Sequence, residues 1–171
     1  CDLISFNLSA GVGGFFVCGS TAEVFLMSGE ERRRIYDIAA REAGGRVPLI
    51  AHIGAISTSE AISYGRYVRE LGYDAVSAIA PFYYKFSFEQ IRRHYFSIVE
   101  AVGLPMIVYN FPGFSGVSLG EDELGLFLEH SEFIGVKHTS SDFYTLERLK
   151  AAYPEKVFFN GFDEMLLSGL A

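Results

Sequence analysis

The chain has 171 residues, half of them hydrophobic and 20% of them charged, with a formal net charge of −7. This length fits one domain, and the apolar content provides a buried core and excludes a disordered chain. The acidic balance, without any basic block, argues against nucleic acid or an anionic membrane surface as a partner. No uninterrupted apolar run reaches the roughly 18 residues of a membrane span, and the first residues lack the basic start of a signal peptide.

The two cysteines, Cys1 and Cys18, give neither a disulfide framework nor a metal-ligand set. Cys18 ends an apolar run and is predicted to be a buried thiol, which fits a reducing, cytoplasmic setting. The histidines show no ligand spacing, so no bound metal is expected. Because the chain begins with Cys1 rather than Met and ends on an apolar tail, we expect it to be a fragment of a longer protein.

Short apolar, β-favouring runs recur along the chain at intervals of roughly 25–35 residues, the length of a βα unit. They are Phe15–Cys18, Pro48–Ile53, Ala75–Ile79, Pro105–Tyr109, Phe133–Val136 and Lys156–Phe159. Each run is continuous instead of alternating, which is typical of parallel strands that are buried on both faces.

Amphipathic segments separate these runs and are predicted to be helices. They extend from Ser28 to Ala43, from about Thr58 to Leu71, from Ser87 to Val102, from near Gly120 through Leu128, and from Asp142 to Ala152. Ser28 with Glu31 three residues later has the pattern of a capping box, and Gly72 follows the second segment as a C-terminal glycine. This alternation predicts an α/β fold with a parallel sheet.

Polar residues cluster just after the predicted strand ends. They are Ser20-Thr21, His52, Tyr83-Tyr84, Tyr109-Asn110, Lys137-His138-Thr139 and Asn160-Asp163-Glu164. This edge carries the active-site loops in a TIM (β/α)8 barrel, whereas the Gly-rich turn of a doubly wound dinucleotide fold is missing here. With about six of the eight barrel strands, we predict that residues 1–171 form a single (β/α) barrel domain, truncated at both ends.

Lys137 follows the buried run Phe133–Val136, where an unpaired charge is costly. Burial would favour the neutral amine, which can attack a carbonyl carbon and form a Schiff base. The same lysine can instead extend its head to the rim or pair with a carboxylate, so spacing alone leaves both interpretations open. Tyr109 closes another run, and its phenol can relay a proton or can be an ordinary core hydroxyl.

Three loops after strands offer further candidate contacts. The segment 19–23, Gly-Ser-Thr-Ala-Glu, presents N–H groups and hydroxyls that can hold a carboxylate, or it only caps the next helix. The aromatic segment 81–88 lines a pocket or a subunit interface, or packs into the core. Asp163 and Glu164 can accept hydrogen bonds from substrate hydroxyls, or they can start a helix.

Taken together, these motifs resemble the N-acetylneuraminate lyase branch of the dihydrodipicolinate synthase/N-acetylneuraminate lyase family, which are class I aldolases on a TIM barrel. The resemblance runs through the whole chain, in family order and at family spacing. It is carried by the segments Gly19–Glu23, Leu49–Gly54, Ala80–Tyr84, Leu104–Asn110, Gly135–Ser140 and Asn160–Glu164.

The resemblance implies roles for individual residues. Lys137 resembles the lysine that forms an imine with pyruvate, and Tyr109 resembles the tyrosine that relays a proton during C–C cleavage. Ser20 and Thr21 resemble the pair that holds the pyruvate carboxylate, and Ser20 also resembles a member of the proton relay. The positions that hold the sugar-derived hydroxyls correspond to Thr139, Gly161, Asp163 and Glu164.

The implied activity is cleavage of N-acetylneuraminate to N-acetylmannosamine and pyruvate, with no cofactor beyond the covalent Schiff base on Lys137. The resemblance also implies a homotetramer in which Tyr83 reaches into a neighbouring subunit's site. Two alternatives stay open. One is another pyruvate-dependent aldolase of the same family, and the other is a non-catalytic protein that binds a keto acid or a sugar.

Three departures from the family pattern matter. Phe114 stands where the synthases carry an arginine for the second substrate's carboxylate, which favours the lyase branch. Ala22 replaces the usual glycine, at a cost of about 1 kcal/mol if this position needs a positive φ. The first and last barrel strands have no counterpart, so we predict that the chain alone is inactive or poorly folded, which a pyruvate-release assay tests.

Overall fold

The computed structural model describes residues 2–171 and contains six parallel strands, each paired with the next one along the chain. The strands are β1 Phe15–Val17, β2 Leu49–His52, β3 Ala75–Ile79, β4 Met106–Asn110, β5 Phe133–His138 and β6 Val157–Asn160. Each lies where an apolar run predicted it, with ends that differ by at most two residues. The predicted α/β class and parallel sheet are therefore confirmed.

All five predicted helices are present and connect successive strands. They are α2 Gly29–Ala43, α3 Thr58–Glu70, α4 Phe88–Val102, α6 Glu121–Leu128 and α7 Phe143–Ala152. Three further helices, which the sequence patterns did not predict, are α1 Asp2–Ser9, α5 Pro112–Ser115 and α8 Leu166–Leu170. The short 3₁₀ turns Ser20–Ala22, Val24–Leu26 and Asp163–Met165 follow β1 and β6.

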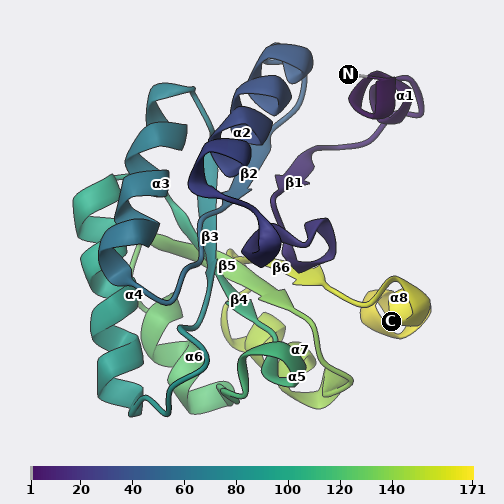
Figure 1. Cartoon of the computed structure of the whole chain (residues 1–171). Coiled ribbons are helices and arrows are strands. Elements are labelled where there is room, and N and C mark those ends of the chain that lie inside the picture. The colour runs from purple at the N-terminus through teal and green to yellow at the C-terminus, as the bar shows by residue number, and fades with distance from the viewer. Residues whose placement is uncertain (1) are drawn as a thin grey trace.

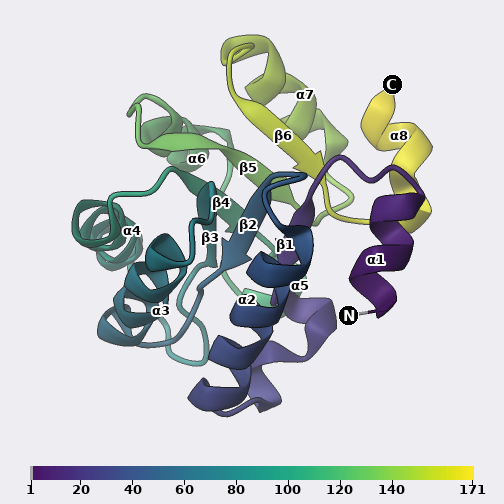
Figure 2. The same cartoon turned by 90° about the horizontal axis from the view of Figure 1, so that it is seen from above.

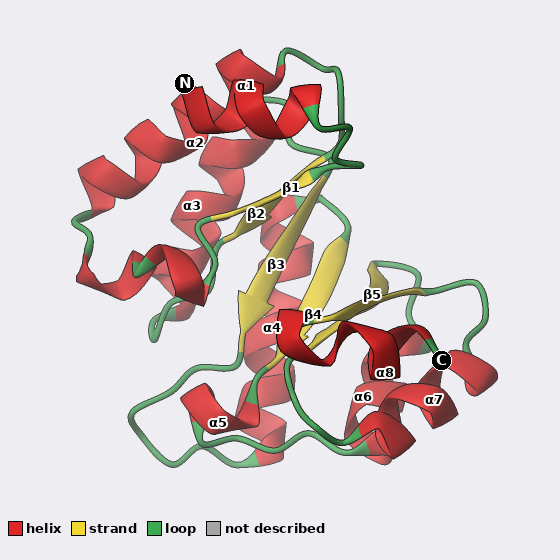
Figure 3. Ribbon diagram, turned by 90° about the vertical axis from the view of Figure 1, so that its right-hand side faces the viewer, coloured by secondary structure: helices red, strands yellow, loops and turns green. Residues whose placement is uncertain are grey.

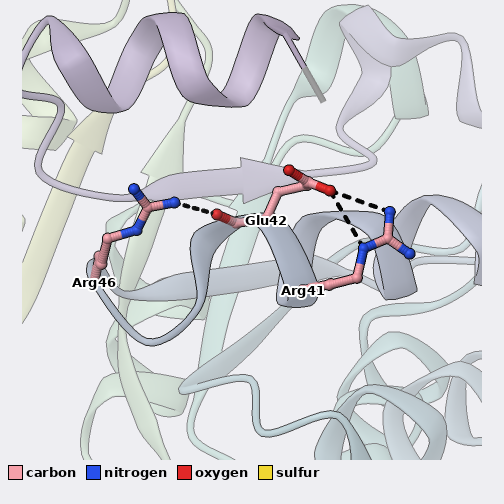
Figure 4. A network of polar contacts seen from close by, with 3 residues as sticks. All are labelled: Arg41, Glu42 and Arg46. Atoms are coloured by element: carbon pink, nitrogen blue, oxygen red, sulfur yellow. Dashed lines mark hydrogen bonds and ion pairs between the residues drawn. The ribbon is translucent and has the colours of Figure 1, made fainter.

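Polar side chains stabilise both ends of α2, which is terminated by Gly44, a residue in the left-handed conformation. The hydroxyl of Ser28 accepts a hydrogen bond from the Glu31 N–H, and the Glu31 carboxylate accepts one from the Ser28 N–H, which confirms the capping box. At the other end, Arg41 binds the Glu42 carboxylate at 3.1 Å and Arg46 donates to the Glu42 carbonyl (Figure 4). These cations lie where the helix dipole favours positive charge.

The sheet curls, and helices α2, α3, α4, α6 and α7 surround its convex face (Figures 1 and 2). The main hydrophobic core fills the space between this face and the helices. It includes strand residues such as Ala51, Val76, Val108 and Val136, together with Phe127 of α6. Helices α1 and α8 lie on the open side of the curve near β1 and β6, where α1 also contacts α2 (Figures 2 and 3). The arrangement is part of a TIM-type barrel, as predicted.

The register of the strands decides which side chains share the concave face. Ile79 of β3 pairs with Tyr109 of β4, Tyr109 pairs with Lys137 of β5, and Lys137 pairs with Phe159 of β6. A bulge between Met106 and Ile107 shifts the β4–β5 register by one residue. Because partners in a parallel ladder point to the same side, these residues face the inside of the curve. All strands run in one direction, and α5 lies beyond the tip of β4 (Figure 3).

Candidate active site

Lys137 and Tyr109 lie together at the carboxyl ends of neighbouring strands. The Lys137 ammonium nitrogen is 3.9 Å from the centre of the Tyr109 ring and 5.2 Å from the centre of the Phe16 ring. Among residues 2–171 the ion pairs are Arg41–Glu42 and Arg92–Glu89, so no carboxylate neutralises Lys137. The alternative of a lysine paired with an acid therefore does not apply, and the amine faces the concave side.

Thr139 and Gly161 adjoin this lysine. The Lys137 Nζ donates to the Thr139 hydroxyl at 3.3 Å, and the Gly161 N–H donates to the His138 carbonyl at 2.8 Å. A Cβ atom at Gly161 would lie 1.9 Å from the Thr139 Oγ1, far closer than atoms can approach. Glycine is therefore required here for the end of β6 to pack against the end of β5.

Ser20 and Thr21 form the turn that follows β1. The Ser20 hydroxyl oxygen is buried and has no hydrogen-bond partner within the described chain. Such a group costs free energy unless a ligand or water satisfies it, so this oxygen is available to a substrate. Cys18 and Glu23, on either side of the turn, have positive φ angles of 61° and 55°. Strain of this kind is concentrated at functional sites.

Ala22 does not carry the strain that its replacement of a glycine suggested. The described non-glycine residues with positive φ are Cys18, Glu23 and Tyr83, and Ala22 is not among them. It lies inside the 3₁₀ turn Ser20–Ala22. The conditional cost does not arise, because the left-handed position falls one residue later, at Glu23.

The aromatic segment after β3 divides between two roles. The Phe82 ring packs against Phe25 at 4.6 Å and against Phe114 at 5.7 Å between ring centres, and Phe114 in turn stacks on Phe111 at 5.8 Å. These four rings form an aromatic wall beside Tyr109, which stacks on Phe111. The other aromatic rings of the segment 81–88 are not part of this wall.

Tyr83 is not part of the Lys137 cluster within one chain. Its side chain is 82% exposed, and its ring packs edge-on against Tyr84. The positive φ of 77° at Tyr83 holds this exposed ring at a tight turn. Its contribution to a neighbouring subunit's site stays a prediction.

Asp163 and Glu164 lie in the 3₁₀ turn after β6 and are exposed. Phe162, the preceding residue, packs edge-on against Phe111 with ring centres 6.2 Å apart, which ties this turn to the end of β4. The two acids thus sit at the same edge of the sheet as Lys137, although neither contacts it. They also begin a helical segment, because α8 follows directly.

His138, next to Lys137 in sequence, connects the end of β5 to neighbouring segments on the convex side of the sheet. His138 points away from Lys137, as alternation predicted, and its Nδ1 lies 3.3 Å from the Asn110 amide while its Nε2 lies 3.0 Å from the Asp142 carbonyl. Burial lowers the pKa of His138, which favours the neutral imidazole. Burial also raises the pKa of Cys18 to about 11, so this thiol is not a nucleophile at neutral pH. Cys1 lies outside the described residues.

Two further residues line the cluster: the sequence placed His52 at the polar edge without giving it a role, and it did not single out Phe16. Phe16 of β1 packs edge-on against Tyr109 at 5.8 Å between ring centres, and His52 of β2 does so at 5.5 Å. The signal for His52 was its place at the end of an apolar run, where a polar residue marks the active edge of a barrel. Phe16 gave no such signal, because it looks like any other apolar strand residue.

The described residues provide no metal site and no membrane-spanning helix. Within residues 2–171 no group of three or more His, Cys, Asp or Glu side chains is placed to hold a metal ion. No helix of this part of the chain combines the length and the apolar character that crossing a bilayer requires. The cluster at the carboxyl edge is an amine beside a phenol and the Thr139 hydroxyl, which suits chemistry on a carbonyl compound.

The sequence profile of the dihydrodipicolinate synthetase family matches residues 1–171. The chain belongs to this family. An N-acetylneuraminate lyase of Pasteurella multocida is 49% identical over 156 residues, which are 91% of this chain and 53% of that protein. The chain therefore spans about half the length of the curated relatives that it matches.

Solved structures of this family have the same fold. The N-acetylneuraminate lyase of Fusobacterium nucleatum, complexed with pyruvate, superposes with a TM-score of 0.86 at 46% identity over 92% of this chain and 53% of that one. CdNal of Clostridium difficile, in complex with mannosamine, gives a TM-score of 0.90 at 43% identity over 92% of this chain and 55% of that one. These matches agree with the resemblance that the motifs indicated.

Proposed function

We propose that the protein containing this chain is a carbon–carbon lyase that cleaves N-acetylneuraminate into N-acetylmannosamine and pyruvate through a Schiff base on Lys137. The observation that carries the proposal is the unpaired Lys137 amine, 3.9 Å from the centre of the Tyr109 ring, in a chain that is 49% identical to a named lyase. A concave face that combines these two groups has the nucleophile and the proton carrier that an aldol cleavage needs.

The proposed reaction begins when the Lys137 nitrogen attacks the keto carbon of the open-chain sugar acid and water leaves, giving a protonated imine. Tyr109 takes the proton of the hydroxyl two carbons further on. The bond between the hydroxyl-bearing carbon and the methylene carbon next to the imine breaks. Its electron pair moves into the imine to give an enamine, and the sugar aldehyde leaves. The enamine carbon then takes this hydroxyl proton from Tyr109, and water hydrolyses the imine, which releases pyruvate and restores the amine.

The other candidate residues are proposed to hold the substrate. Ser20 and Thr21 would bind the pyruvate carboxylate, and the buried, unpartnered Ser20 hydroxyl supports this role because a ligand oxygen would satisfy it. The sugar hydroxyls are assigned to Thr139, Gly161, Asp163 and Glu164. In support, the first two adjoin Lys137, and the two acids are exposed at the same edge.

Assembly and location are part of the same proposal. A homotetramer would place Tyr83 of one subunit in its neighbour's site, and the 82% exposure of this ring makes it available for such a contact. A cytoplasmic location fits Cys18, which is a free, buried thiol. No cofactor is required, because the Schiff base on Lys137 accepts the electrons.

One observation weighs on a second candidate, another pyruvate-dependent aldolase of the family. Phe114 presents an apolar ring in the aromatic wall with Phe25, Phe82 and Phe111, where a synthase would need a cation for an anionic partner. This favours a neutral, polyhydroxy aldehyde. A non-catalytic keto-acid or sugar binder is the third candidate, and the same experiment separates it.

The decisive experiment uses the full-length protein with pyruvate and borohydride, followed by peptide mass analysis. We expect a reduced pyruvate adduct on Lys137, with no adduct in a Lys137→Met variant that still folds. Release of N-acetylmannosamine from N-acetylneuraminate then separates the lyase from other aldolases. An adduct without cleavage of this sugar would favour the second candidate, and the absence of any adduct would favour the non-catalytic binder and sink the proposal.

A further inference from the structure

His52, at the end of β2, is completely buried beside the candidate site and takes no part in the proposed reaction. Its Nδ1 lies 2.9 Å from the carbonyl oxygen of Cys18, and its Nε2 lies 3.3 Å from the backbone nitrogen of Ile79. The ring therefore connects the ends of three strands, β1, β2 and β3, at the carboxyl edge of the sheet.

The two partners fix the protonation state of the ring. A carbonyl oxygen only accepts hydrogen bonds, and a backbone N–H only donates them, so Nδ1 carries the proton and Nε2 is the acceptor. Burial, assisted by the positive charge of Arg32, lowers the pKa of His52 to about 3. The imidazole is thus a neutral group with one tautomer, which excludes it as an acid or base at neutral pH.

The backbone of His52 is held just as firmly from the helix side. The buried Arg32 guanidinium donates to the His52 carbonyl at 2.7 Å and to the Gly54 carbonyl at 3.1 Å. The Tyr36 hydroxyl donates to the same His52 carbonyl at 2.5 Å. A fully buried Arg and Tyr that both bind one carbonyl give a rigid support, so the imidazole has no freedom to move away from its partners.

The ring contacts both halves of the proposed catalytic machinery. The Cys18 carbonyl that it binds belongs to a residue with φ of 61°, directly before Gly19 and the turn with the unpartnered Ser20 hydroxyl. On its other side the imidazole packs edge-on against Tyr109, with ring centres 5.5 Å apart and planes at 86°. One side chain thus sets the entry to the carboxylate-binding turn and supports the ring of the proton carrier.

We propose that His52 is a positioning residue for pyruvate and for proton transfer: its Nδ1–H fixes the turn around Ser20, and its ring fixes Tyr109. This inference rests on the proposed function. The two contacts use different parts of the same side chain, so substitutions can separate them.

Two variants of the full-length protein divide the contacts. His52→Phe keeps a ring beside Tyr109 but donates nothing to Cys18, whereas His52→Asn keeps an N–H donor near the Nδ1 position and removes most of the ring. The readouts are the pyruvate concentration that gives half-maximal borohydride trapping, and the turnover number for cleavage of N-acetylneuraminate. His130→Asn, at an exposed position after α6, serves as the control and is expected to change neither.

For His52→Phe we expect the half-maximal pyruvate concentration to rise about tenfold, the effect of one lost neutral hydrogen bond, with a smaller change in turnover. For His52→Asn we expect turnover to fall by up to about tenfold, the effect of one lost aromatic pair, with trapping little changed. Equal losses in both quantities for both variants would mean a merely structural role and would overturn the inference. If His52→Phe does not fold, the tautomer of the imidazole in the unsubstituted protein decides in its place.

A measurement that needs no activity separates this inference from the proposed function. Nitrogen-15 NMR of the imidazole, assigned by its loss in His52→Asn, must show the Nδ1–H tautomer at neutral pH. The Nε2–H tautomer or an imidazolium would overturn the inference even in an active enzyme. Failure of the unsubstituted protein to trap pyruvate, with the expected tautomer present, would instead overturn the proposed function.

Discussion

The two faces of the curled sheet differ in the chemical character of the side chains that they carry. The convex face packs apolar side chains such as Val76, Val108 and Val136 against the helices in one continuous core. The concave face carries Lys137 without a carboxylate partner, and the turn beside it holds a buried Ser20 hydroxyl without any partner in the described chain.

This difference teaches that stability and chemistry are assigned to opposite sides of the same strands. Val108 and Tyr109 are neighbours in sequence, and so are Val136 and Lys137, yet in each pair one residue builds the core and the other faces the site. A substitution on the convex face should therefore affect unfolding, and one on the concave face should affect turnover. The following predictions test this separation.

The largest expected effect comes from Tyr109→Phe on the concave face. Loss of the phenolic proton carrier should lower turnover of N-acetylneuraminate by about 10²–10⁴-fold, the usual range for general acid–base catalysis. Because the ring and its packing stay, the free energy of unfolding and the trapping of pyruvate on Lys137 should change little. Steady-state kinetics and thermal unfolding of the full-length protein check both parts. A variant with unchanged turnover would remove Tyr109 from the mechanism.

The matching change in the helix layer is Phe127→Ala. Phe127 is completely buried and packs against Tyr95, Phe133 and further rings, so its truncation should cost about 3–5 kcal/mol of unfolding free energy. Turnover of the molecules that remain folded should stay normal. Urea unfolding measures the loss, and Leu126→Ala, at a half-exposed neighbouring position, is the control that should cost much less. A selective loss of activity here would break the separation of the two faces.

Gly161→Ala tests whether close packing at the end of β6 matters for the site. The new methyl group would lie 1.9 Å from the Thr139 Oγ1, so the threonine that accepts from Lys137 must move. We expect a loss of turnover of about tenfold with a modest loss of stability, since overpacking typically costs about 1–3 kcal/mol. Gly13→Ala, where a Cβ meets open space, is the control. Equal kinetics for the two variants would contradict the prediction.

The smallest expected effect, measured per pH unit, is a gradual loss of unfolding free energy in acid. Burial lowers the pKa of His52 to about 3 and that of His94 to about 4. The unfolded chain therefore binds protons below its ordinary histidine pKa of about 6.5, while the folded one does not, so stability is complete above that value and falls as the pH drops toward 4. Each histidine should contribute about 1.4 kcal/mol per pH unit in this window.

One histidine lies on each side of the comparison, so variants can divide the slope. His94 lies in α4, where its Nδ1 is 2.8 Å from the Thr58 hydroxyl, and His94→Asn should remove the contribution of this histidine to the pH dependence without affecting turnover. Urea unfolding at a series of pH values measures the slope. A slope that does not change in this variant would show that His94 does not titrate on unfolding.

Much of the fold could be predicted, because the strands and main helices carry strong local patterns. Continuous apolar runs identified β1 to β6, and Ser28, Ser87 and Asp142 marked the starts of α2, α4 and α7. Helices α1 and α8 contain no buried residue, so the sequence shows no apolar stripe that would predict them. The four residues of α5 are too few to show a helical period.

The site could be predicted only in part, because local sequence patterns do not determine which residues of different strands become neighbours. Spacing placed Lys137 and Tyr109 at strand ends, but only the register made them direct neighbours. The close approach of Gly161 to Thr139 and the double contact of His52 depend on three-dimensional packing, which no single segment encodes. Ala22 shows the reverse case, where a departure in sequence proved harmless because the strained angle belongs to Glu23.

The bulge between Met106 and Ile107 determines which side chains of β5 face the concave side of the sheet. Met106 pairs with Phe133 and Ile107 pairs with Gly135, so Ile134 is skipped. Without that offset Tyr109 would stand opposite Val136, and the parity of every later residue in the strand would invert. Lys137 would then point into the hydrophobic core under the helices, and His138 would lie beside Tyr109 instead. The one extra residue of the bulge therefore places Lys137 beside Tyr109 on the concave face.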